Sequence, residues 1–403
     1  MTAELLQSFK NIANADVAGK TVLIRADLNV PMSGGQVSDA TRIERLLPTF
    51  RDLLQRGAKV VILSHLGRPD GKAVAKYSLK PVADKLSSLL GAPVAFAEDC
   101  IGPTAEAVVG KLQPGQIAML ENLRFHKEEE ENDKGFATAL AKLGDLYVND
   151  AFSVSHRAHA STEALARLLP AYAGPSMLAE IGALKLALDA PKRPVAAIVG
   201  GSKVSTKIDV LGHLAQKVDF LIIGGGMANT FLFAQGINVG KSLHEAGAVA
   251  TVEDIQRQAE AAGCKILLPV DAVVAGELAP NVETAVVSVS DVPADKMILD
   301  VGPASVAEFG QTLANCATLL WNGPVGAFET APFGEGTFAL ARQAAKLTAA
   351  GALTSIAGGG DTVAALNAAG VTDKFSYVST AGGAFLEWLE GRTLPGVAVL
   401  MNS

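Results

Sequence analysis

The sequence predicts an α/β protein with two doubly wound, parallel-sheet (Rossmann-like) lobes, joined by a connecting helix and hinge. Two observations carry this prediction. The chain has 403 residues, and one domain usually takes about 100–200. Short apolar runs also alternate with longer amphipathic stretches, which is typical of βαβ units. Because these runs are too many for one compact sheet, we expect two sheets.

Each expected strand is a short run of β-branched or other apolar residues that ends in glycine or polar residues. In the first half these runs lie within residues 21–29, 58–67, 116–122 and 145–152. In the second half they lie within residues 194–202, 219–226, 264–271, 317–324 and 353–361. Between the strands, apolar residues at helical spacing predict helices, for example over 42–57 and 252–263.

A connecting helix is expected over residues 176–193, between an N-terminal lobe at 1–175 and a C-terminal lobe at 194–389. Four apolar side chains in this stretch fall at near-helical spacing and are bracketed by Pro175 and Pro191: Met177, Ile181, Leu184 and Leu188. A helix at this position would let the two lobes move as rigid bodies about its ends.

Composition excludes several classes of function. The formal net charge is −7 and only 5% of the residues are aromatic, so neither a generally basic surface for nucleic acid nor a row of base-stacking side chains is expected. Three widely spaced cysteines, Cys100, Cys264 and Cys316, predict reduced thiols. No apolar run reaches the roughly 18–20 residues of a membrane span, and the N-terminal segment lacks the pattern of a signal peptide. We therefore expect a cytoplasmic protein.

The charges are unevenly distributed along the chain. Residues 1–175 contain 20 Lys and Arg against 20 Asp and Glu, whereas residues 176–403 contain 14 against 21. Polar side chains of the first part follow the expected strands: Arg25, Asp27, Asn29, His65, Arg68, Arg124, His156, Arg157 and His159, with Arg42 at the start of a helix. Open α/β sheets bind ligands at the carboxyl ends of their strands, and arginine grips phosphate and carboxylate oxygens with two nitrogens. A small polyanion is the predicted ligand.

Other polar features are interpreted as structural. The acidic run at 128–133 is expected to form a solvent-exposed face. His126, His213 and His244 are expected to have no role in a site, and no His/Cys spacing matches a zinc centre.

Glycine-rich turns follow the expected strands of the second part and begin helices, within residues 200–207, 224–230, 321–329, 358–366 and 379–387. A helix N-terminus presents unpaired N–H groups, and glycine lets a phosphate approach the backbone closely. Several such turns at one sheet edge predict a nucleotide site. Residues 236–242 resemble a phosphate-binding loop but have three residues between the glycines instead of four, and residues 334–339 resemble a dinucleotide loop without a preceding strand. An NAD-dependent oxidoreductase is therefore disfavoured.

Long segments of the chain resemble the signature segments of the phosphoglycerate kinase family, bacterial type. They occur in the family order at 21–31, 39–50, 64–71, 119–130, 150–161, 200–207, 222–231, 321–329, 358–362 and 379–391. The resemblance implies a monomeric, hinge-bending glycolytic and gluconeogenic enzyme that transfers a phosphoryl group between 1,3-bisphosphoglycerate and ADP, giving 3-phosphoglycerate and Mg²⁺-bound ATP. It also implies that residues 390–403 return to the N-terminal lobe, with no nucleic-acid or membrane partner.

The resemblance also implies a role for individual residues. The phosphoglycerate would be held by Asp27, Leu28, Asn29, Arg42, His65, Leu66, Gly67, Arg68, Arg124 and Arg157. The nucleotide would be held by Gly201, Lys203, Lys207, Gly225, Gly226, Asn322, Pro324, Glu329, Gly359, Gly360, Asp361 and Thr362, with Asp361 on Mg²⁺. Catalysis would rest on Arg42, Lys207, Gly382 and Gly383.

Two departures from the family pattern are visible, at Ala381 and in the segment Ser153–Ser155. A non-catalytic binding protein that retains the fold is the strongest rival interpretation, and Arg42, Lys207 and Asp361 speak against it.

Overall fold

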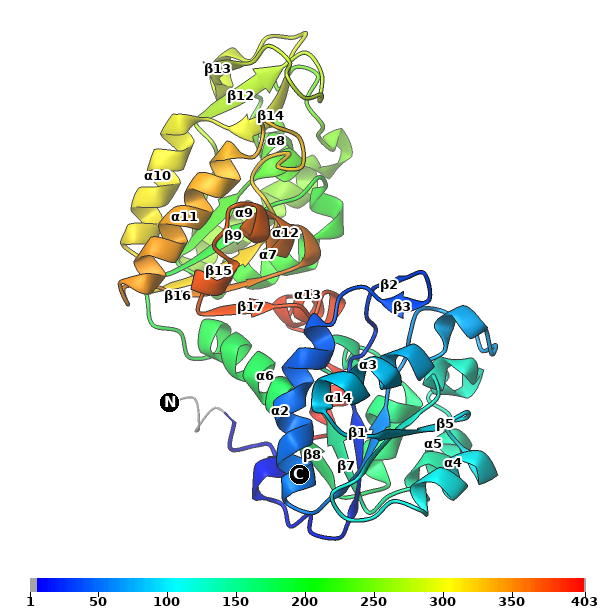
Figure 1. Cartoon of the computed structure of the whole chain (residues 1–403). Coiled ribbons are helices and arrows are strands. Elements are labelled where there is room, and N and C mark those ends of the chain that lie inside the picture. The colour runs from blue at the N-terminus through cyan, green and yellow to red at the C-terminus, as the bar shows by residue number, and fades with distance from the viewer. Residues whose placement is uncertain (1–5, 402–403) are drawn as a thin grey trace. The chain divides into compact units, whose positions relative to one another are not determined.

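The computed structural model describes residues 6–401. The chain divides into two compact units (Figure 1), and its last segment belongs to the first of them. The first unit comprises Met1–Gly182 with Thr393–Ser403, and the second comprises Ala183–Arg392. Among residues 6–401, no helix has the length and apolar character that crossing a membrane requires.

The first unit is built on a six-stranded sheet in which all neighbouring strands run parallel. The strand order is β5 (Val94–Ala97), β6 (Ile117–Leu120), β4 (Lys59–Leu63), β1 (Thr21–Arg25), β7 (Leu146–Asn149) and β8 (Ala171–Ala173). The four central strands match the predicted runs. The pattern did not predict the edge strands β5 and β8, because both are short and only partly buried. A two-stranded hairpin, β2 (Met32–Ser33) and β3 (Gln36–Val37), follows β1.

In the described chain, five α-helices lie wholly within the first unit: α2 (Thr41–Gln55), α3 (Lys80–Leu90), α4 (Gly102–Val109), α5 (Lys134–Ala141) and the short C-terminal α14 (Pro395–Ala398). Among them, α2, α3 and α4 pack directly on this sheet. Phe50 and Leu53 of α2 share a core with Val22 and Ile24 of β1. Leu23, on the opposite face of β1, is also fully buried. Both faces of the sheet are therefore covered, as a doubly wound fold requires.

The second unit repeats the design with a six-stranded parallel sheet. Its order is β11 (Lys265–Leu267), β10 (Phe220–Ile223), β9 (Val195–Val199), β15 (Thr318–Asn322), β16 (Thr354–Gly358) and β17 (Tyr377–Ser379). Its helices are α7 (Ile208–Ala215), α8 (Gly225–Ala234), α9 (Val249–Ala262), α10 (Pro303–Ala314), α11 (Glu335–Ala349), α12 (Gly360–Ala368) and α13 (Gly383–Leu389). Two six-stranded parallel sheets confirm the predicted fold class.

A small antiparallel sheet in the second unit was not predicted. It consists of β13 (Ala285–Ser288), β12 (Asp271–Ala275) and β14 (Met297–Val301). β13 is largely exposed, and β14 begins with three half-buried residues. Neither therefore shows the continuous apolar run by which the parallel strands are predicted.

Helix α6 (Pro175–Leu188) lies where the connecting helix was expected and crosses from one unit into the other. Met177, Ile181 and Leu184 are fully buried. The helix ends at Leu188, before the predicted end at residue 193. The N–H groups of Asp189 and Ala190 close on the carbonyl of Lys185, and a proline follows them.

The carboxylate of Asp150 holds the start of α6. Its Oδ1 accepts the N–H of Met177 at 3.0 Å, and its Oδ2 accepts the hydroxyls of Thr49 and Ser176, each at 3.3 Å. The side chain is buried, and burial raises the pKa of Asp150 to about 6, although these hydrogen bonds lower it. The folded protein therefore binds a proton at this carboxyl over a pH range in which the unfolded chain has lost it.

This burial predicts a pH-dependent stability. A raised pKa favours the folded state below pH 4, and the advantage is lost as the pH rises from about 4 to about 6. The stability difference between wild type and Asp150→Asn should change by up to about 3 kcal/mol over that window. Urea unfolding of both proteins between pH 4 and 7 measures it. Parallel stability profiles for the two proteins would contradict the prediction.

Candidate functional site

The predicted anion-binding residues of the first unit lie at the carboxyl ends of neighbouring parallel strands, and therefore at one sheet edge. Asp27 and Asn29 follow β1, and His65 and Arg68 follow β4. Arg124 follows β6, and the loop with Arg157 and His159 follows β7. Arg42 is the second residue of α2.

Two small networks organise this edge. In the first, Asp27 Oδ2 pairs with Arg42 Nη1 at 2.5 Å and accepts the hydroxyl of Ser153 at 2.5 Å. In the second, Asn29 Oδ1 accepts the N–H of Gly67 at 2.9 Å, and Arg124 Nη1 donates to the Gly67 carbonyl at 3.0 Å. The departure from the family pattern at Ser153 thus adds a donor to Asp27. The loops after β1, β4, β6 and β7 are locked together by the side chains that were predicted to bind the ligand.

Charge at this edge is carried by arginine. Arg68 is exposed and has no hydrogen bond or ion pair with residues 6–401, and Arg42 is 36% exposed. Burial, with Arg124 and Arg25 nearby, lowers the pKa of His159 to about 4. The imidazole of His159 is therefore neutral at pH 7, while the guanidinium groups remain charged. Such an edge suits a ligand with several anionic oxygens.

Leu28 and Leu66 were also predicted to bind the substrate, but their side chains are buried in the core. The Leu28 N–H donates to the Ser64 hydroxyl at 3.1 Å, and the Leu66 carbonyl accepts from Asn122 at 2.8 Å. Any contact that these two residues make with a ligand must therefore come from the backbone.

The prediction that residues 128–133 form a solvent-exposed face is wrong at Glu129, which is fully buried. A 3₁₀ turn over Lys127–Glu129 directs its carboxylate inward, where it accepts the N–H and the hydroxyl of Ser161 at 2.9 and 2.6 Å. Buried carboxylates persist when they are hydrogen-bonded and paired with a cation. A run of acidic letters does not show which member turns inward.

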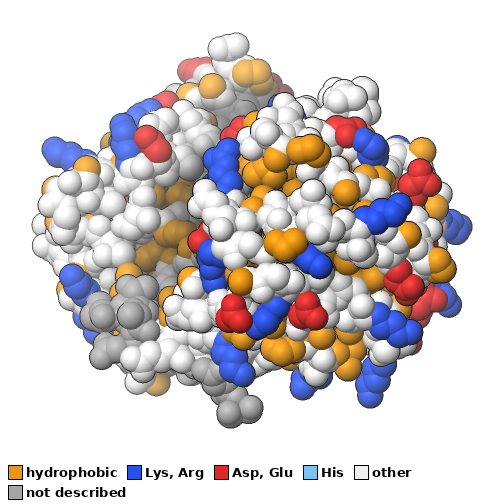
Figure 2. All heavy atoms as spheres, turned by 60° about the horizontal axis from the view of Figure 1, so that its bottom comes forward, with side chains coloured by type: hydrophobic (Ala, Val, Ile, Leu, Met, Phe, Trp, Pro, Cys, Tyr) orange, Lys and Arg blue, Asp and Glu red, His pale blue; other side chains and the backbone are white. Residues whose placement is uncertain are grey.

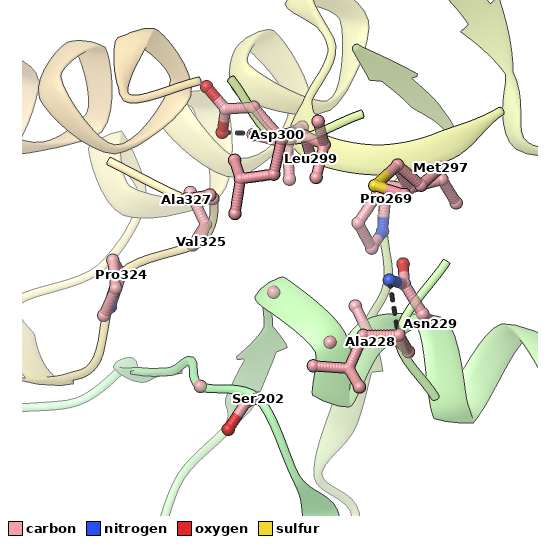
Figure 3. Close-up of a pocket in the computed structure, with 18 of the residues that line it drawn as sticks. Ser202, Ala228, Asn229, Pro269, Met297, Leu299, Asp300, Pro324, Val325 and Ala327 are labelled. Carbon is pink, nitrogen blue, oxygen red and sulfur yellow. Dashed lines mark hydrogen bonds between the residues drawn. The ribbon is translucent and has the colours of Figure 1, made fainter. Parts of the chain in front are cut away.

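The second unit contains a pocket of about 390 Å³ beyond the carboxyl ends of its strands. Six residues that were predicted to bind the nucleotide line it: Gly201, Gly225, Gly226, Pro324, Glu329 and Asp361. Figure 3 shows Pro324, Val325 and Ala327 on one side of the space and Ala228 with Asn229 on another. A volume in this range with apolar walls suits a ring the size of a nucleobase with its sugar.

Sequence reasoning missed the wall of this pocket that β14 supplies. Met297, Leu299 and Asp300 line the space together with Pro269, which precedes β12 (Figure 3). Asp300 is buried and accepts the N–H groups of Val301 at 2.9 Å and Gly336 at 2.8 Å. Burial raises the pKa of Asp300 to about 7. These residues belong to the antiparallel sheet, whose strands lack the pattern used to find the others.

Close backbone packing explains several of the glycines in this unit. A Cβ on Gly226 would lie 2.6 Å from the carbonyl oxygen of Ser202, and one on Gly200 would lie 1.8 Å from that of Pro324. The loops after β9, β10 and β15 can therefore approach one another this closely only because these two positions are glycines. This packing accounts for part of the glycine pattern independently of a phosphate.

Gly200→Ala is expected to destabilise the second unit by about 3 kcal/mol or more, because the new methyl group would overlap backbone that cannot move aside. Gly247→Ala is a matched control, since nothing lies within 4 Å of a Cβ built there. Thermal unfolding of both variants measures the effect. A Gly200→Ala protein as stable as Gly247→Ala would contradict the prediction.

Lys207 lies next to the pocket residues and is held by three oxygen contacts. Its Nζ donates to the Gly200 carbonyl at 2.7 Å and to the side-chain and main-chain oxygens of Asn322 at 2.7 and 3.2 Å. The other amide atom of Asn322, Nδ2, donates to the Gly358 carbonyl at 2.9 Å. Burial lowers the pKa of Lys207 to about 8, and Asp361 opposes this shift. The lysine and the α12 loop are thus electrostatically coupled.

Except for Lys203, the remaining predicted residues lie around the starts of α12 and α13. Gly359 is the N-cap of α12, Gly360 is its first residue, and Thr362 Oγ1 accepts the Gly323 N–H at 2.7 Å. Asp361 is exposed in the first turn of α12 and has no hydrogen bond or ion pair with the described residues. Lys203 is exposed on the β9 loop. Helix α13 begins at Gly383 after Gly382, whose φ is +54°.

Two segments, residues 236–242 and 334–339, resemble nucleotide-binding loops in sequence but were expected to lack a preceding strand. Residues 236–242 follow helix α8, and residues 334–339 run from a turn into α11. Neither loop begins directly after a strand in the described chain, so neither has the context of a nucleotide loop.

Figure 2 shows basic, acidic and apolar side chains interspersed over the face that it draws.

Two doubly wound units, one with an arginine-rich sheet edge and one with a glycine-rich pocket, are the arrangement expected of a two-domain α/β phosphotransferase. The phosphoglycerate kinase family model matches residues 12–392. The phosphoglycerate kinase of Allorhizobium ampelinum is 59% identical over 396 residues, covering 98% of this chain and 99% of its own. That of Ruegeria sp. is 59% identical over 394 residues, covering 98% and 100%. The solved phosphoglycerate kinase of Coxiella burnetii superposes with a TM-score of 0.92 at 44% identity, covering 97% and 98%.

The chain belongs to the phosphoglycerate kinase family. It is a glycolytic phosphotransferase with a carboxyl group as acceptor, and the family uses a magnesium-bound nucleotide.

Proposed function

We propose that the edge of the first unit holds 3-phosphoglycerate or 1,3-bisphosphoglycerate, and that the pocket of the second unit holds Mg²⁺-bound ADP or ATP. The convergence of Arg42, Arg68, Arg124 and Arg157 on the edge that contains Asp27 and Asn29 carries the first assignment. Guanidinium groups match phosphate and carboxylate oxygens, while Asp27 and Asn29 offer oxygens to the substrate hydroxyl. The reaction is reversible phosphoryl transfer between 1,3-bisphosphoglycerate and ADP.

The nucleotide assignment rests on the pocket and on what lies beside it. Its apolar walls would take the base, and Glu329 would accept hydrogen bonds from the ribose. Lys207, Lys203 and the N-terminal turn of α12 would face the phosphates. Asp361 fits Mg²⁺, because it offers an exposed hard oxygen ligand in the turn where these phosphates would lie. When bound at Asp361, the metal would neutralise negative charge on the phosphates.

The proposed mechanism needs no general base. In the direction of ATP consumption, a carboxylate oxygen of 3-phosphoglycerate attacks the γ-phosphorus, and the bond to the bridging oxygen of ADP breaks. A carboxyl with a pKa of about 3.5 is already ionised at pH 7. The task of the protein is to align the reactants and to neutralise the transferring oxygens. Arg42 and Lys207 would supply fixed positive charge, with N–H groups at Gly382 and Gly383 as additional donors.

Because the two ligands belong to different units, transfer requires the units to close about the segment that joins them. Closure would also exclude water, which hydrolyses acyl phosphates. Small-angle scattering with and without both substrates tests this. Closure predicts a smaller radius of gyration with both substrates bound, and no change would contradict it.

The low pKa of Lys207 predicts an alkaline limit for nucleotide use. In the free enzyme this amine loses its charge as the pH rises through about 8, so kcat/KM for Mg²⁺-bound ATP should fall above that pH by up to about tenfold per pH unit. Lys207→Arg keeps its charge and should move the decline to higher pH. A wild-type profile that stays flat to pH 9 would contradict the prediction.

The activity itself is tested by ATP consumption that depends on 3-phosphoglycerate and Mg²⁺, coupled to NADH oxidation through added glyceraldehyde-3-phosphate dehydrogenase. If no NADH oxidation is observed although the coupling enzyme is active, the result would favour a non-catalytic binding protein. Light scattering after gel filtration tests the monomer that the family resemblance supports, for which a mass of 41.5 kDa is expected.

A further inference from the structure

Arg25 is a fully buried arginine behind the anion edge, and all three of its nitrogens have partners. Its Nε donates to the hydroxyl of Ser161 at 2.9 Å, and its Nη1 donates to the carbonyl of Ala26 at 2.6 Å. Its Nη2 lies 3.0 Å from Nδ1 of His65. A buried guanidinium held at three points cannot rotate, so it fixes the groups that it contacts.

Ser161 connects Arg25 to the buried carboxylate of Glu129. The Ser161 hydroxyl accepts from Arg25 and donates to Glu129 Oε1 at 2.6 Å, while the Ser161 N–H donates to Oε2 at 2.9 Å. Tyr147 donates to the Ser161 carbonyl at 2.7 Å. Glu129 is the acidic group whose charge acts most strongly on Arg25. The buried cation is thus balanced through one serine hydroxyl.

This geometry determines which nitrogen of His65 carries the proton. A guanidinium nitrogen can only donate, so His65 Nδ1 must accept and cannot be protonated. A neutral imidazole then has its proton on Nε2. Burial, together with Arg25 and Arg124, lowers the pKa of His65 well below its ordinary value. Nε2 has no hydrogen-bond partner within residues 6–401.

We propose that Glu129 and Ser161 are positioning residues, which hold Arg25 so that His65 keeps its proton on Nε2 and offers a neutral N–H to the anionic substrate. The opposite tautomer would present a lone pair to a phosphate or carboxylate oxygen and repel it. This inference rests on the proposed phosphoglycerate site of the first unit. It assigns a task to an acidic side chain that the substrate does not reach.

The tautomer is measured directly by NMR of ¹⁵N-histidine-labelled protein at pH 7. The chain has six histidines, and the signal missing in His65→Gln identifies His65. The wild type should show a protonated Nε2 and a bare Nδ1. Protonation of Nδ1, or a fully charged ring, would overturn the proposal whether or not any variant folds.

Two variants test the roles of the supporting residues. Ser161→Ala and Glu129→Gln should each mix the two His65 tautomers and raise the KM for 3-phosphoglycerate about tenfold. The KM for Mg²⁺-bound ATP should stay within about twofold, which a general loss of folding would not produce. Ser355→Ala, which removes another fully buried serine hydroxyl in the second unit, is the matched control.

Folded variants with an unchanged His65 tautomer and an unchanged KM would overturn the proposal. Ser161→Thr keeps the hydroxyl and should therefore show the wild-type spectrum and KM. A folded Ser161→Thr protein without them would count equally against the proposed positioning role of Ser161. If His65→Gln leaves the KM for 3-phosphoglycerate unchanged, the proposed substrate site is wrong at His65, whatever the tautomer. The two failures are therefore distinguishable.

Discussion

Arg42→Ala is expected to lower kcat for phosphoryl transfer on the order of 100-fold or more, because removal of one fixed donor to a developing charge costs about that much. Arg42 is placed for this role by Asp27, whose Oδ2 pairs with its Nη1 at 2.5 Å. Ser153 donates to the same oxygen at 2.5 Å. Asp27 would therefore keep a hydrogen-bond partner in the Arg42→Ala protein.

The measurement is kcat in the coupled assay at saturating substrates. Arg45→Ala is the matched control, since Arg45 is exposed one turn further along α2 and has no proposed contact with either substrate. Arg42→Lys keeps the charge without the two-nitrogen fork and should be intermediate. Turnover of Arg42→Ala within about threefold of the wild type would remove this residue from the catalytic group.

Asp361→Asn is expected to raise the KM for Mg²⁺-bound ATP about tenfold or more, with little change in the KM for 3-phosphoglycerate. The substitution keeps the size of the side chain but removes the charged oxygen that Mg²⁺ prefers. It also removes the charge that raises the pKa of Lys207, so the alkaline limit of nucleotide use should move to lower pH.

Titration calorimetry with ADP at several Mg²⁺ concentrations measures this effect directly, because a metal ligand alters the dependence on Mg²⁺ and not only the affinity. Asp373→Asn is the control, an exposed aspartate in the same unit just after α12. An unchanged dependence on Mg²⁺ in Asp361→Asn would show that the metal is held elsewhere.

The strands that carry the site could be predicted, because each is a buried apolar run that ends in a polar or glycine residue. Such a run reports burial on both faces of a parallel sheet, and this made the placement of Asp27, His65 and Lys207 predictable. The edge strands and the antiparallel sheet lack this pattern, so the pocket wall with Met297 and Asp300 could not be found.

Contacts between loops that are far apart in the sequence could not be predicted either. Glu129 and Ser161 are 32 positions apart, and the letters of an acidic run do not tell which residue points inward. The sequence likewise did not predict that Asp99, Cys100 and His126 lie close together in space. Their potential metal-ligand atoms lie within 4.8 Å of one another. His126 Nε2 lies 2.7 Å from Asp99 Oδ1, and this contact explains their proximity without a metal.

The return of the last segment has a consequence for synthesis of the chain on the ribosome. Gly396 donates its N–H to the Ser155 carbonyl at 2.9 Å, and its carbonyl accepts from Asn149 at 3.2 Å, at the end of β7. Gly396 lies almost 250 residues after Asn149 in the chain. It therefore emerges from the ribosome only after the whole second unit has been made. The first unit therefore remains unfinished throughout translation of the second, and a chain truncated before Thr393 would lack the segment that holds the loop after β7.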